Sequence, residues 1–454
     1  MVRCSPFLLS VQRPRPFLAF ALLLTASLAP AADPAFTVTP DKATGVYAPE
    51  EKVTWTVDVK GERAGLMALP YKVKKDAQGE VVSGTIDLSA GPATITATRG
   101  EPGALLAQIF SMDAAKPLPV AMGGAVFSPE KIGPAVPAPE DFDAFWQAKL
   151  KELADVPPNP VVEKVDISSV KNGEGMECYK VTLDNIRGTH ARGILAKPAG
   201  EGKYPAMLLV NSAGVYALDK AQVIGYAKSG WIVLNVNAHD LPVDESDAYY
   251  KDLKEGSLKN YFYLGSEDRE TSYFLRMFLG CVRGAEYLAS RPDWDGKILL
   301  VTGISQGGMQ AFATAALYPK VTAVMANVPG GCDNHAPLAN PPRAFGWPYW
   351  MTKVGAPAGR DLEKATKTAG YYEGIHFASR IHCPTLVGVA LLDIAARPAG
   401  VIAAFNAVNA PKELIIMPVA DHHGSGGSQA AYFTTFAKWR EAMKKGQPLP
   451  IKSS

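Results

Sequence analysis

The sequence predicts an α/β protein in which a mostly parallel central sheet, flanked by helices, follows a small all-β sandwich of Ig-like type. Three observations predict this class. Short alternating segments separated by Gly, Pro and Asp fill residues 36–113, as in a sandwich. Continuous apolar runs such as AMLLV and WIVLNV come next, and such runs are typical of parallel strands buried on both faces. Segments with helical periodicity lie between these runs.

Residues 1–32 have the pattern of a secretory signal peptide. Basic Arg13 and Arg15 precede the apolar run FLAFALLLTASLA, and small residues surround Ala31. The run is shorter than the roughly 20 residues that span a bilayer, and a short membrane anchor is the alternative. We therefore predict a secreted or periplasmic protein with no membrane span after cleavage of the signal.

The remaining chain is predicted to form two domains. Residues 33–115 form the sandwich, and residues 116–138 are a linker because they are rich in Pro, Ala and Gly. Residues 139–454 form the catalytic domain, which begins with a capped helix at PEDFDAFWQAKL. Its strands are expected at 176–184, 192–198, 206–211, 231–236, 297–303, 322–328, 384–390 and 412–418, and its helices at 271–291, 306–317, 398–408 and 429–445.

Charge and cysteine usage exclude several classes of partner. The 454 residues include 46 basic and 44 acidic side chains, a formal net charge of +2, in no long run of one sign, so no nucleic-acid partner is expected. The cysteines that follow the signal lie far apart in the sequence and are expected to be free thiols, one disulfide being the alternative. They are Cys178, Cys281, Cys332 and Cys383. With no zinc spacing, phosphate loop or dinucleotide fingerprint, neither a metal nor a cofactor is expected.

The segment LLVTGISQGGMQAF predicts a nucleophile at Ser305. Gly303-Ile304-Ser305-Gln306-Gly307 matches G-x-S-x-G, a pattern that is weak by itself. Here an apolar strand precedes it and an Ala-rich helical segment follows, which is the context of a nucleophile elbow in the α/β-hydrolase fold. We therefore predict this fold, with Ser305 as the attacking group.

A serine nucleophile needs a base, and the base needs a carboxylate that orients it. In this fold the acid and the base follow the serine in that order, at the ends of later strands. PTLVGVALLD ends in Asp393, and KELIIMPVADHH ends in His422 and His423. We predict Asp393 as the acid and His422 as the base, with His423 as the alternative base.

Two backbone amides are expected to stabilise the oxyanion. One is the amide of Gln306, which follows the nucleophile, and the other is that of Ala213 in the small-residue loop after LLV. The segment FGWPYW lies where such folds insert lids, so Trp347 and Trp350 are candidates for stacking on sugar rings. Structural packing of both tryptophans, and an ordinary turn at Ala213, are the alternatives.

These motifs resemble the acetyl xylan esterase and cephalosporin C deacetylase family, the seventh family of carbohydrate esterases, over residues 138–445. The likeness rests on G-x-S-Q-G-G at Gly303–Gly308, on PEDFDAFW, and on CPTLVGVALLD followed by Arg-Pro. It implies that Ser305, Asp393 and His422 are nucleophile, acid and base. The family's Arg-Gly-Gln motif lines up with residues 237–239, which makes His239 a substrate-binding candidate, and its His-Gly-Tyr loop lines up with residues 211–213.

The resemblance implies an exported serine carboxylesterase that removes O-acetyl groups from carbohydrate such as acetylated xylan or xylo-oligosaccharides. The expected partner is that substrate, and a homo-oligomer is left open. The alternatives are another α/β-hydrolase, a peptidase or a glucuronoyl esterase, and a non-catalytic glycan-binding protein on a hydrolase scaffold. Glucuronoyl esterases have an Arg where Gln306 stands, which argues against that alternative.

Overall fold

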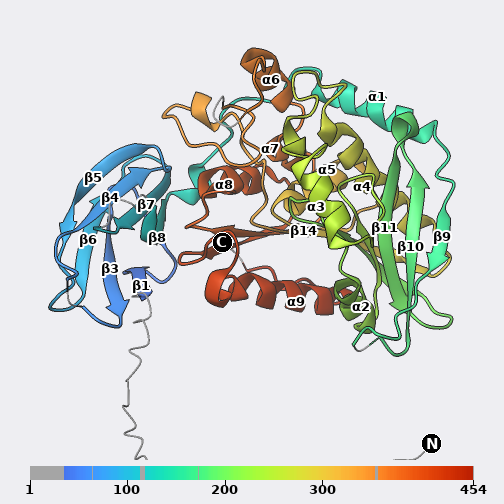
Figure 1. Ribbon diagram of the computed structural model, residues 1–454, viewed down its shortest axis with the longest axis horizontal. Coiled ribbons are helices and arrows are strands. Elements are labelled where there is room, and N and C mark those ends of the chain that lie inside the picture. Colours follow the sequence, from blue (N-terminus) through green and yellow to red (C-terminus); the bar gives the residue numbers. More distant parts are fainter. Residues whose placement is uncertain (1–34, 64, 113–117, 172, 353–355, 453–454) are drawn as a thin grey trace, which may run out of the picture.

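The computed structural model describes residues 35–63, 65–112, 118–171, 173–352 and 356–452. The predicted signal peptide lies outside these residues. A β-sandwich and a larger α/β unit lie side by side, the sandwich against the edge of the α/β unit that contains α8, Pro398–Ala407 (Figure 1). The α/β-hydrolase fold and the N-terminal β-rich region expected from the sequence are both present.

The sandwich packs two sheets around an apolar core, and their strands pair antiparallel except for β2, which pairs in parallel with β8. One sheet has the order β1-β3-β6 and the other the order β2-β8-β7-β4-β5 in the described residues. The fully buried side chains between them include Val53, Trp55, Val73 and Leu105. The strands are β1 (Ala35–Pro40), β2 (Val46–Tyr47), β3 (Lys52–Lys60), β4 (Leu69–Lys75), β5 (Gly79–Ile86), β6 (Ala93–Thr98), β7 (Gly103–Phe110) and β8 (Pro119–Phe127).

Strand β8 differs from the sequence prediction, because it lies inside the expected linker 116–138. Its residues pair with β7 along their length, from Gly103↔Phe127 to Phe110↔Pro119. Close packing requires the two glycines of this strand, Gly123 and Gly124. A Cβ at Gly123 would lie 2.4 Å from Val38 Cγ1 and 2.7 Å from Trp55 Cδ1. Residues 119–127 are therefore a strand of the sandwich.

The central sheet of the α/β unit has nine strands in the described residues, in the order β17-β16-β15-β14-β12-β13-β11-β10-β9. The strands from β12 to β17 pair in parallel, and β9, β10 and β11 pair antiparallel at the other edge. The strands are β9 (Val161–Lys164), β10 (Met176–Asp184), β11 (His190–Pro198), β12 (Tyr204–Val210), β13 (Ile232–Val236), β14 (Trp294–Ile304), β15 (Ala323–Asn327), β16 (Thr385–Ala390) and β17 (Lys412–Met417).

Helices cover both faces of this sheet, with α2 and α9 on one side and α4, α5, α7 and α8 on the other (Figure 1). Buried apolar side chains of β12, β14 and α5 join in one core, which Trp146 of α1 extends. The helices are α1 (Phe142–Ala154), α2 (Lys220–Lys228), α3 (Asp247–Glu255), α4 (Tyr273–Ser290), α5 (Gln306–Leu317), α6 (Leu362–Ala369), α7 (Gly374–Ala378), α8 and α9 (Ala430–Lys444). Across the described residues, no helix is both long and apolar enough to cross a membrane. The four described cysteines are buried and free.

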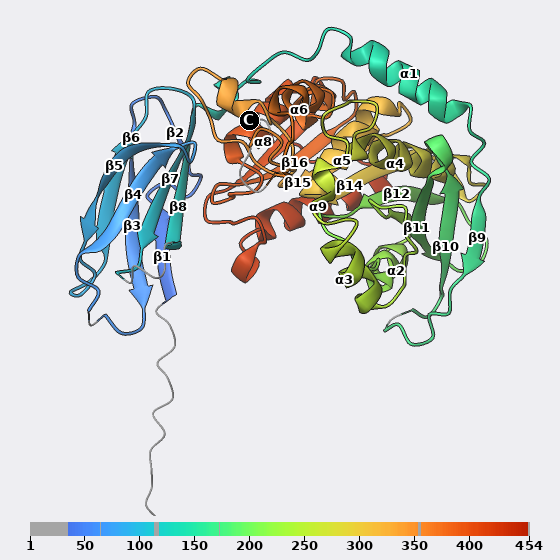
Figure 2. The same ribbon diagram turned by 45° about the horizontal axis from the view of Figure 1, so that its top comes forward.

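The sandwich packs directly on the ends of β16 and β17 (Figure 2). A Cβ at Gly124 of β8 would lie 2.4 Å from Leu391 Cβ, and one at Gly45 would lie 2.9 Å from Pro418 Cβ. Farther along the interface, the Asp76 carbonyl accepts a hydrogen bond from the Ala344 amide. These contacts place the sandwich against the two strand ends that lead to Asp393 and His422.

Candidate active site

Ser305 occupies a sharp turn between β14 and α5. Its backbone has φ 58° and ψ −119°, a conformation that costs a non-glycine residue on the order of 1–3 kcal/mol. The flanking glycines allow the turn, since a Cβ at Gly307 would lie 2.2 Å from the Val210 carbonyl oxygen and one at Gly303 would lie 2.4 Å from the Gly307 carbonyl carbon. The Ser305 amide donates to the Asn327 carbonyl over 3.0 Å, which fixes the turn to the end of β15.

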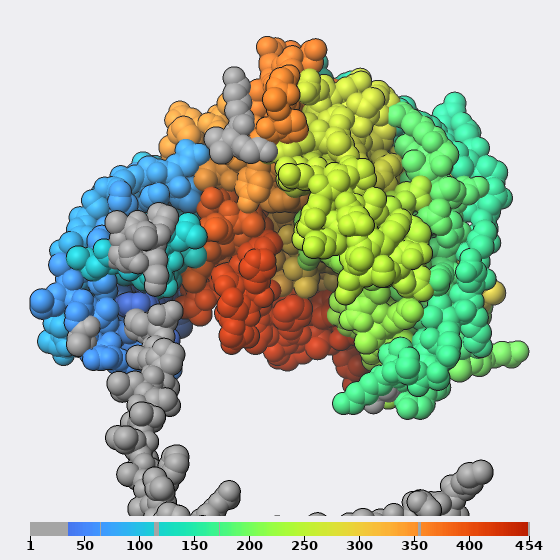
Figure 3. All heavy atoms as spheres, in the orientation of Figure 1, coloured from blue at the N-terminus to red at the C-terminus, as the bar shows by residue number. Residues whose placement is uncertain are grey.

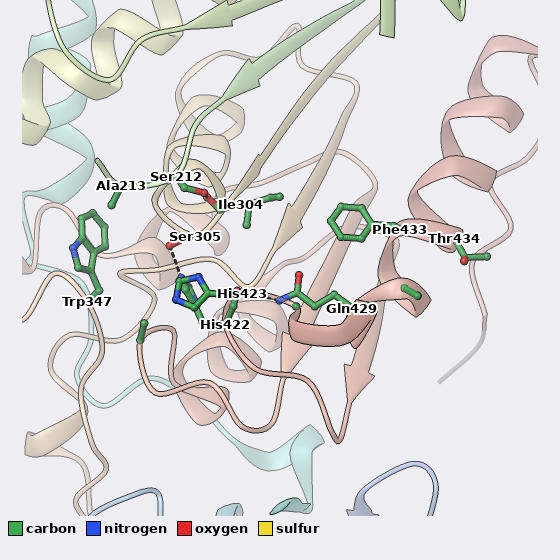
Figure 4. A pocket seen from close by; sticks show the side chains of 14 residues that line it. Ser212, Ala213, Ile304, Ser305, Trp347, His422, His423, Gln429, Phe433 and Thr434 are labelled. Atoms are coloured by element: carbon green, nitrogen blue, oxygen red, sulfur yellow. Dashed lines mark hydrogen bonds between the residues drawn. The ribbon is translucent and has the colours of Figure 1, made fainter. Parts of the chain in front are cut away.

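The structure brings Ser305, His422 and Asp393 into one hydrogen-bonded chain (Figure 4 shows the Ser305–His422 contact). His422 Nε2 lies 2.9 Å from Ser305 Oγ, and His422 Nδ1 lies 2.6 Å from Asp393 Oδ2. Because a carboxylate accepts the proton on Nδ1, Nε2 is left to accept the serine proton. Asp393 is 2% exposed, so its carboxylate is held away from bulk water.

The Asp393 carboxylate is fixed by its own loop. Its Oδ1 accepts hydrogen bonds from the amides of Ala395 and Ala396, both at 2.7 Å, while Oδ2 faces His422. Both oxygens of the buried carboxylate thus have partners. Asp393, the predicted acid, lies in the loop that follows β16, which ends at Ala390.

The alternative base, His423, lines the same pocket, but its ring makes no hydrogen bond to Ser305 or Asp393 in the described part of the chain. Its side chain is exposed, and its amide donates to Asp421 Oδ1 over 3.1 Å. Its ring packs edge-on against His422 at 5.3 Å between centroids. The geometry therefore places His422, and not His423, next to the serine hydroxyl.

Two residues that sequence reasoning missed connect the serine turn to the histidine loop. Asn327 Nδ2 donates to Gln429 Oε1 over 2.6 Å, and the Asn327 carbonyl is the acceptor for the Ser305 amide. Gln429 Nε2 donates to the carbonyls of Asp421 and His422, at 2.8 and 3.1 Å. Both side chains are buried, so these bonds are shielded from water. Only the position of Asn327 at a strand end gave a signal in the sequence.

The two backbone N–H groups predicted to bind the oxyanion, those of Gln306 and Ala213, make no hydrogen bond to any residue in the described ranges. Ala213 lines the same pocket as Ser305, and Gln306 is the first residue of α5, whose N-terminal amides have no partner within the helix. The Gln306 side chain is held by the Tyr261 hydroxyl, which donates to its Oε1.

His239 lies behind the Ala213 loop and not in the pocket where the sequence comparison suggested a substrate contact. It is buried, with Nε2 2.8 Å from the Gly214 carbonyl and Nδ1 hydrogen-bonded to the Tyr273 hydroxyl. Burial lowers the pKa of His239 to about 4, so the ring is neutral near pH 7. The residue supports the loop and is screened from ligands by it.

The two candidate tryptophans have different positions. Trp347 lines the pocket beside Ser305 (Figure 4). Trp350 is 2% exposed, donates its ring N–H to the Phe262 carbonyl over 2.7 Å, and packs edge-on against Phe274. Because its ring is enclosed, Trp350 is a packing residue, and of this pair only Trp347 can meet a ligand.

The pocket around Ser305 is an open hollow of about 840 Å³. Figure 3 shows the surface hollowed between the red C-terminal atoms and the yellow-green atoms. No Asp, Glu, Lys or Arg lines it among the described residues, and no group of three or more His, Cys, Asp or Glu in this part of the chain is arranged to hold a metal ion. Its lining residues are Ser212, Ala213, Ile304, Ser305, Trp347, Ala395, His422, His423, Gly424, Gly427, Gln429, Ala430, Phe433 and Thr434.

Comparison with known proteins identifies the family to which the chain belongs. The model of the family described as acetyl xylan esterase (AXE1) matches residues 130–440, about two thirds of the chain. The chain belongs to the acetyl xylan esterase family. The match begins after β8, so the sandwich precedes the region that defines the family.

Individual acetyl xylan esterases and a related acetyl esterase are similar to the chain. It is 34% identical over 362 residues to acetyl esterase Axe7A of Xylanibacter ruminicola, covering 78% of each protein. The fold is similar to an acetyl xylan esterase from Paenibacillus sp. R4, with TM-score 0.58 and 24% identity over 68% of this chain and 98% of that one. Acetyl xylan esterase 1 from Thermoanaerobacterium sp. JW/SL YS485 gives TM-score 0.55 and 25% identity, over 67% and 96%.

Membership confirms the resemblance that the motifs around Ser305 suggested. As an acetyl xylan esterase family member, the protein is a carboxylic ester hydrolase of the serine α/β-hydrolase type. The departures from the family motifs at residues 211–213 and 237–239 lie in and behind the loop that borders the pocket.

Proposed function

We propose that this protein is an exported esterase that removes O-acetyl groups from carbohydrate, acetylated xylan or xylo-oligosaccharides, through an acetyl-serine intermediate. The observation that carries the proposal is the chain of hydrogen bonds from Ser305 to His422 to Asp393, at 2.9 and 2.6 Å, in a pocket open to solvent. The family supports deacetylation of carbohydrate as the general activity.

In the first half of the reaction, Ser305 Oγ attacks the carbonyl carbon of the acetyl ester. His422 Nε2 takes the hydroxyl proton as the O–C bond forms, and Asp393 stabilises the resulting imidazolium. The carbonyl electrons move onto the oxygen, which the Gln306 and Ala213 amides stabilise. One such donor is worth about 3 kcal/mol. Collapse of this intermediate breaks the bond to the sugar oxygen, which takes the proton from His422 and leaves as an alcohol.

In the second half, water replaces the sugar. His422 Nε2 takes a proton from the water as its oxygen attacks the carbonyl carbon of acetyl-Ser305. The same amides stabilise the second oxyanion. When the bond to Oγ breaks, His422 returns the proton to Ser305 and acetate is released.

The absence of charged side chains from the pocket lining supports a neutral ester substrate. A peptidase that recognises a charged chain end would need a counter-charge there, and the described residues that line the pocket include no Asp, Glu, Lys or Arg. Trp347 provides an aromatic wall next to Ser305. Export is supported by the basic, apolar and small-residue pattern of residues 1–32.

The test is acetate release from acetylated xylan, compared with cleavage of an aminoacyl-nitroanilide. We expect acetate release by the wild type and its loss in Ser305→Ala, with an unchanged melting temperature showing that the variant is folded. Activity on the anilide alone would contradict the esterase assignment and indicate a peptidase. Undiminished acetate release by Ser305→Ala would contradict the assignment of Ser305 as the nucleophile. A serine-directed phosphonate should add its mass to the peptide containing Ser305.

A further inference from the structure

We infer that a second pocket, next to the one around Ser305, binds neutral sugar units that adjoin the acetylated one. The pocket has a volume of about 280 Å³ and lies between the start of α2, the end of β14 and the start of α9. Ser212, Ile304 and Phe433 line both pockets, so the two pockets adjoin each other. This subsite rests on the proposed function and specifies where the carbohydrate chain lies.

The direction of the reaction places the sugar on this side of the serine. His422 Nε2 must deliver a proton to the leaving oxygen, so the leaving alcohol lies on the His422 side of the acetyl group. The loop after His422 leads to Gln429, and Phe433 follows Gln429 by one helical turn, on the same face of the chain. In Figure 4, Phe433 and Trp347 lie on opposite sides of Ser305. The acetyl methyl group then points toward Trp347, and the sugar extends toward Phe433.

The aromatic side chains at this side are exposed in the way that sugar recognition requires. Phe433 is 43% exposed and Tyr216 is 38% exposed, and both border the second pocket. The Tyr216 ring is held in place, because its hydroxyl donates to the Ser212 carbonyl over 2.6 Å. An exposed ring presents an apolar face to the C–H groups of a pyranose, whose hydroxyls stay at its rim. Two such rings at one hollow fit a carbohydrate chain better than a short acyl ester.

Two polar side chains that line the second pocket have atoms available to hydrogen-bond a ligand. The Gln222 side chain makes no hydrogen bond to any residue of the described segments, and Asp219 uses one carboxylate oxygen, Oδ1, to accept from the Ala221 amide at the start of α2. An amide and a carboxylate oxygen are suitable partners for sugar hydroxyls. Because Asp219 is the sole charged residue that the described lining contributes, the subsite favours neutral sugars over uronic acids.

The experiment compares acetylated xylotriose with acetylated xylose as substrates. We expect the wild type to have the higher kcat/KM on xylotriose, and Phe433→Ala and Gln222→Ala to reduce the ratio of the two kcat/KM values by about three- to tenfold. Val162→Ala, at a 44% exposed position on the outer strand β9, is the matched surface control and should leave both values unchanged. A ratio unchanged in both pocket variants overturns the subsite.

The design separates the subsite from the proposed function. Acetate release from acetylated xylose and acetylated xylotriose at equal kcat/KM would support the esterase activity and contradict the subsite. No acetate release from either sugar would contradict the proposed substrate. Binding gives a readout without turnover, by titrating Ser305→Ala with deacetylated xylotriose in a calorimeter. We expect the double variant Ser305→Ala/Phe433→Ala to bind xylotriose about three- to tenfold more weakly than Ser305→Ala. Equal affinity of the single and double variants would contradict the subsite.

Discussion

Asn327 Nδ2 donates a hydrogen bond of 2.6 Å to Gln429 Oε1, and this bond joins the turn of the nucleophile to the loop of the base. On one side, the Asn327 carbonyl accepts from the Ser305 amide. On the other side, Gln429 Nε2 donates to the His422 carbonyl over 3.1 Å. The separation between the serine hydroxyl and the imidazole therefore depends on two amide side chains that touch neither group directly.

We predict that Gln429→Met lowers kcat/KM by about 10²-fold, because a misplacement of about 1 Å between reacting groups can cost that much. The free energy of unfolding should fall by only about 1–3 kcal/mol, the cost of leaving the buried Asn327 amide unpaired. Acetate release and urea unfolding measure the two effects. Gln429→Glu is the matched variant, since it retains the acceptor for Asn327 and loses the donor to the His422 carbonyl. A loss of stability without a loss of kcat/KM would contradict the positioning role.

The strands that position the site could be predicted because each contains a short apolar run, ILLV in β14, LVGVA in β16 and LIIM in β17. The segments expected at 297–303, 384–390 and 412–418 correspond to β14, β16 and β17, and Asp393 follows β16 as expected. The linker prediction was wrong at 119–127, because a glycine that packs against Trp55 has the same sequence signal as a glycine in a flexible segment.

The contacts between distant residues could not be predicted in this way. Asn327 and Gln429 are 102 residues apart in the sequence. They meet because β15, which ends at Asn327, pairs with β16 in the sheet, and because α9, which begins after Gln429, packs against β16. His239 was expected to contact the substrate because of its place in the alignment of motifs. In the fold, the Ala213 loop lies over it and its ring bonds to Gly214 and Tyr273. Side-chain direction at a strand end depends on tertiary packing and not on the local pattern.

The assignment of the base can be tested by comparing the two adjacent histidines. His422→Ala should lower kcat by about 10³-fold or more, because Ser305 would lose its proton acceptor. His423→Ala should retain kcat within about threefold, since its ring has no hydrogen bond to Ser305 or Asp393. Rates of phosphonate labelling at Ser305 give the same comparison for the first step alone. The reverse order of effects would assign His423 as the base.

The packing of the sandwich on the acid loop predicts an effect of a distant glycine on catalysis. Gly124→Ala places a Cβ 2.4 Å from Leu391 Cβ, two residues before Asp393, and Leu391 has to move to accommodate it. We expect kcat to fall by about tenfold or more through displacement of Asp393. Gly91→Ala adds the same methyl group to the sandwich where no atom lies within 4 Å, and it should change neither kcat nor stability. Equal kcat in the two variants would show that the sandwich does not position the acid.

The buried His239 predicts how stability depends on pH. Its pKa is lowered by burial from 6.5 to about 4, so between these values the unfolded chain binds a proton that the folded protein does not. The contribution of this group is fully present above pH 6.5 and is lost as the pH falls toward 4. Between pH 7 and pH 4.5 the loss is about 2–3 kcal/mol. We expect urea unfolding to show a smaller loss for His239→Gln, whose amide can still donate to the Gly214 carbonyl. Equal losses in the wild type and this variant would mean that His239 is protonated in the folded protein.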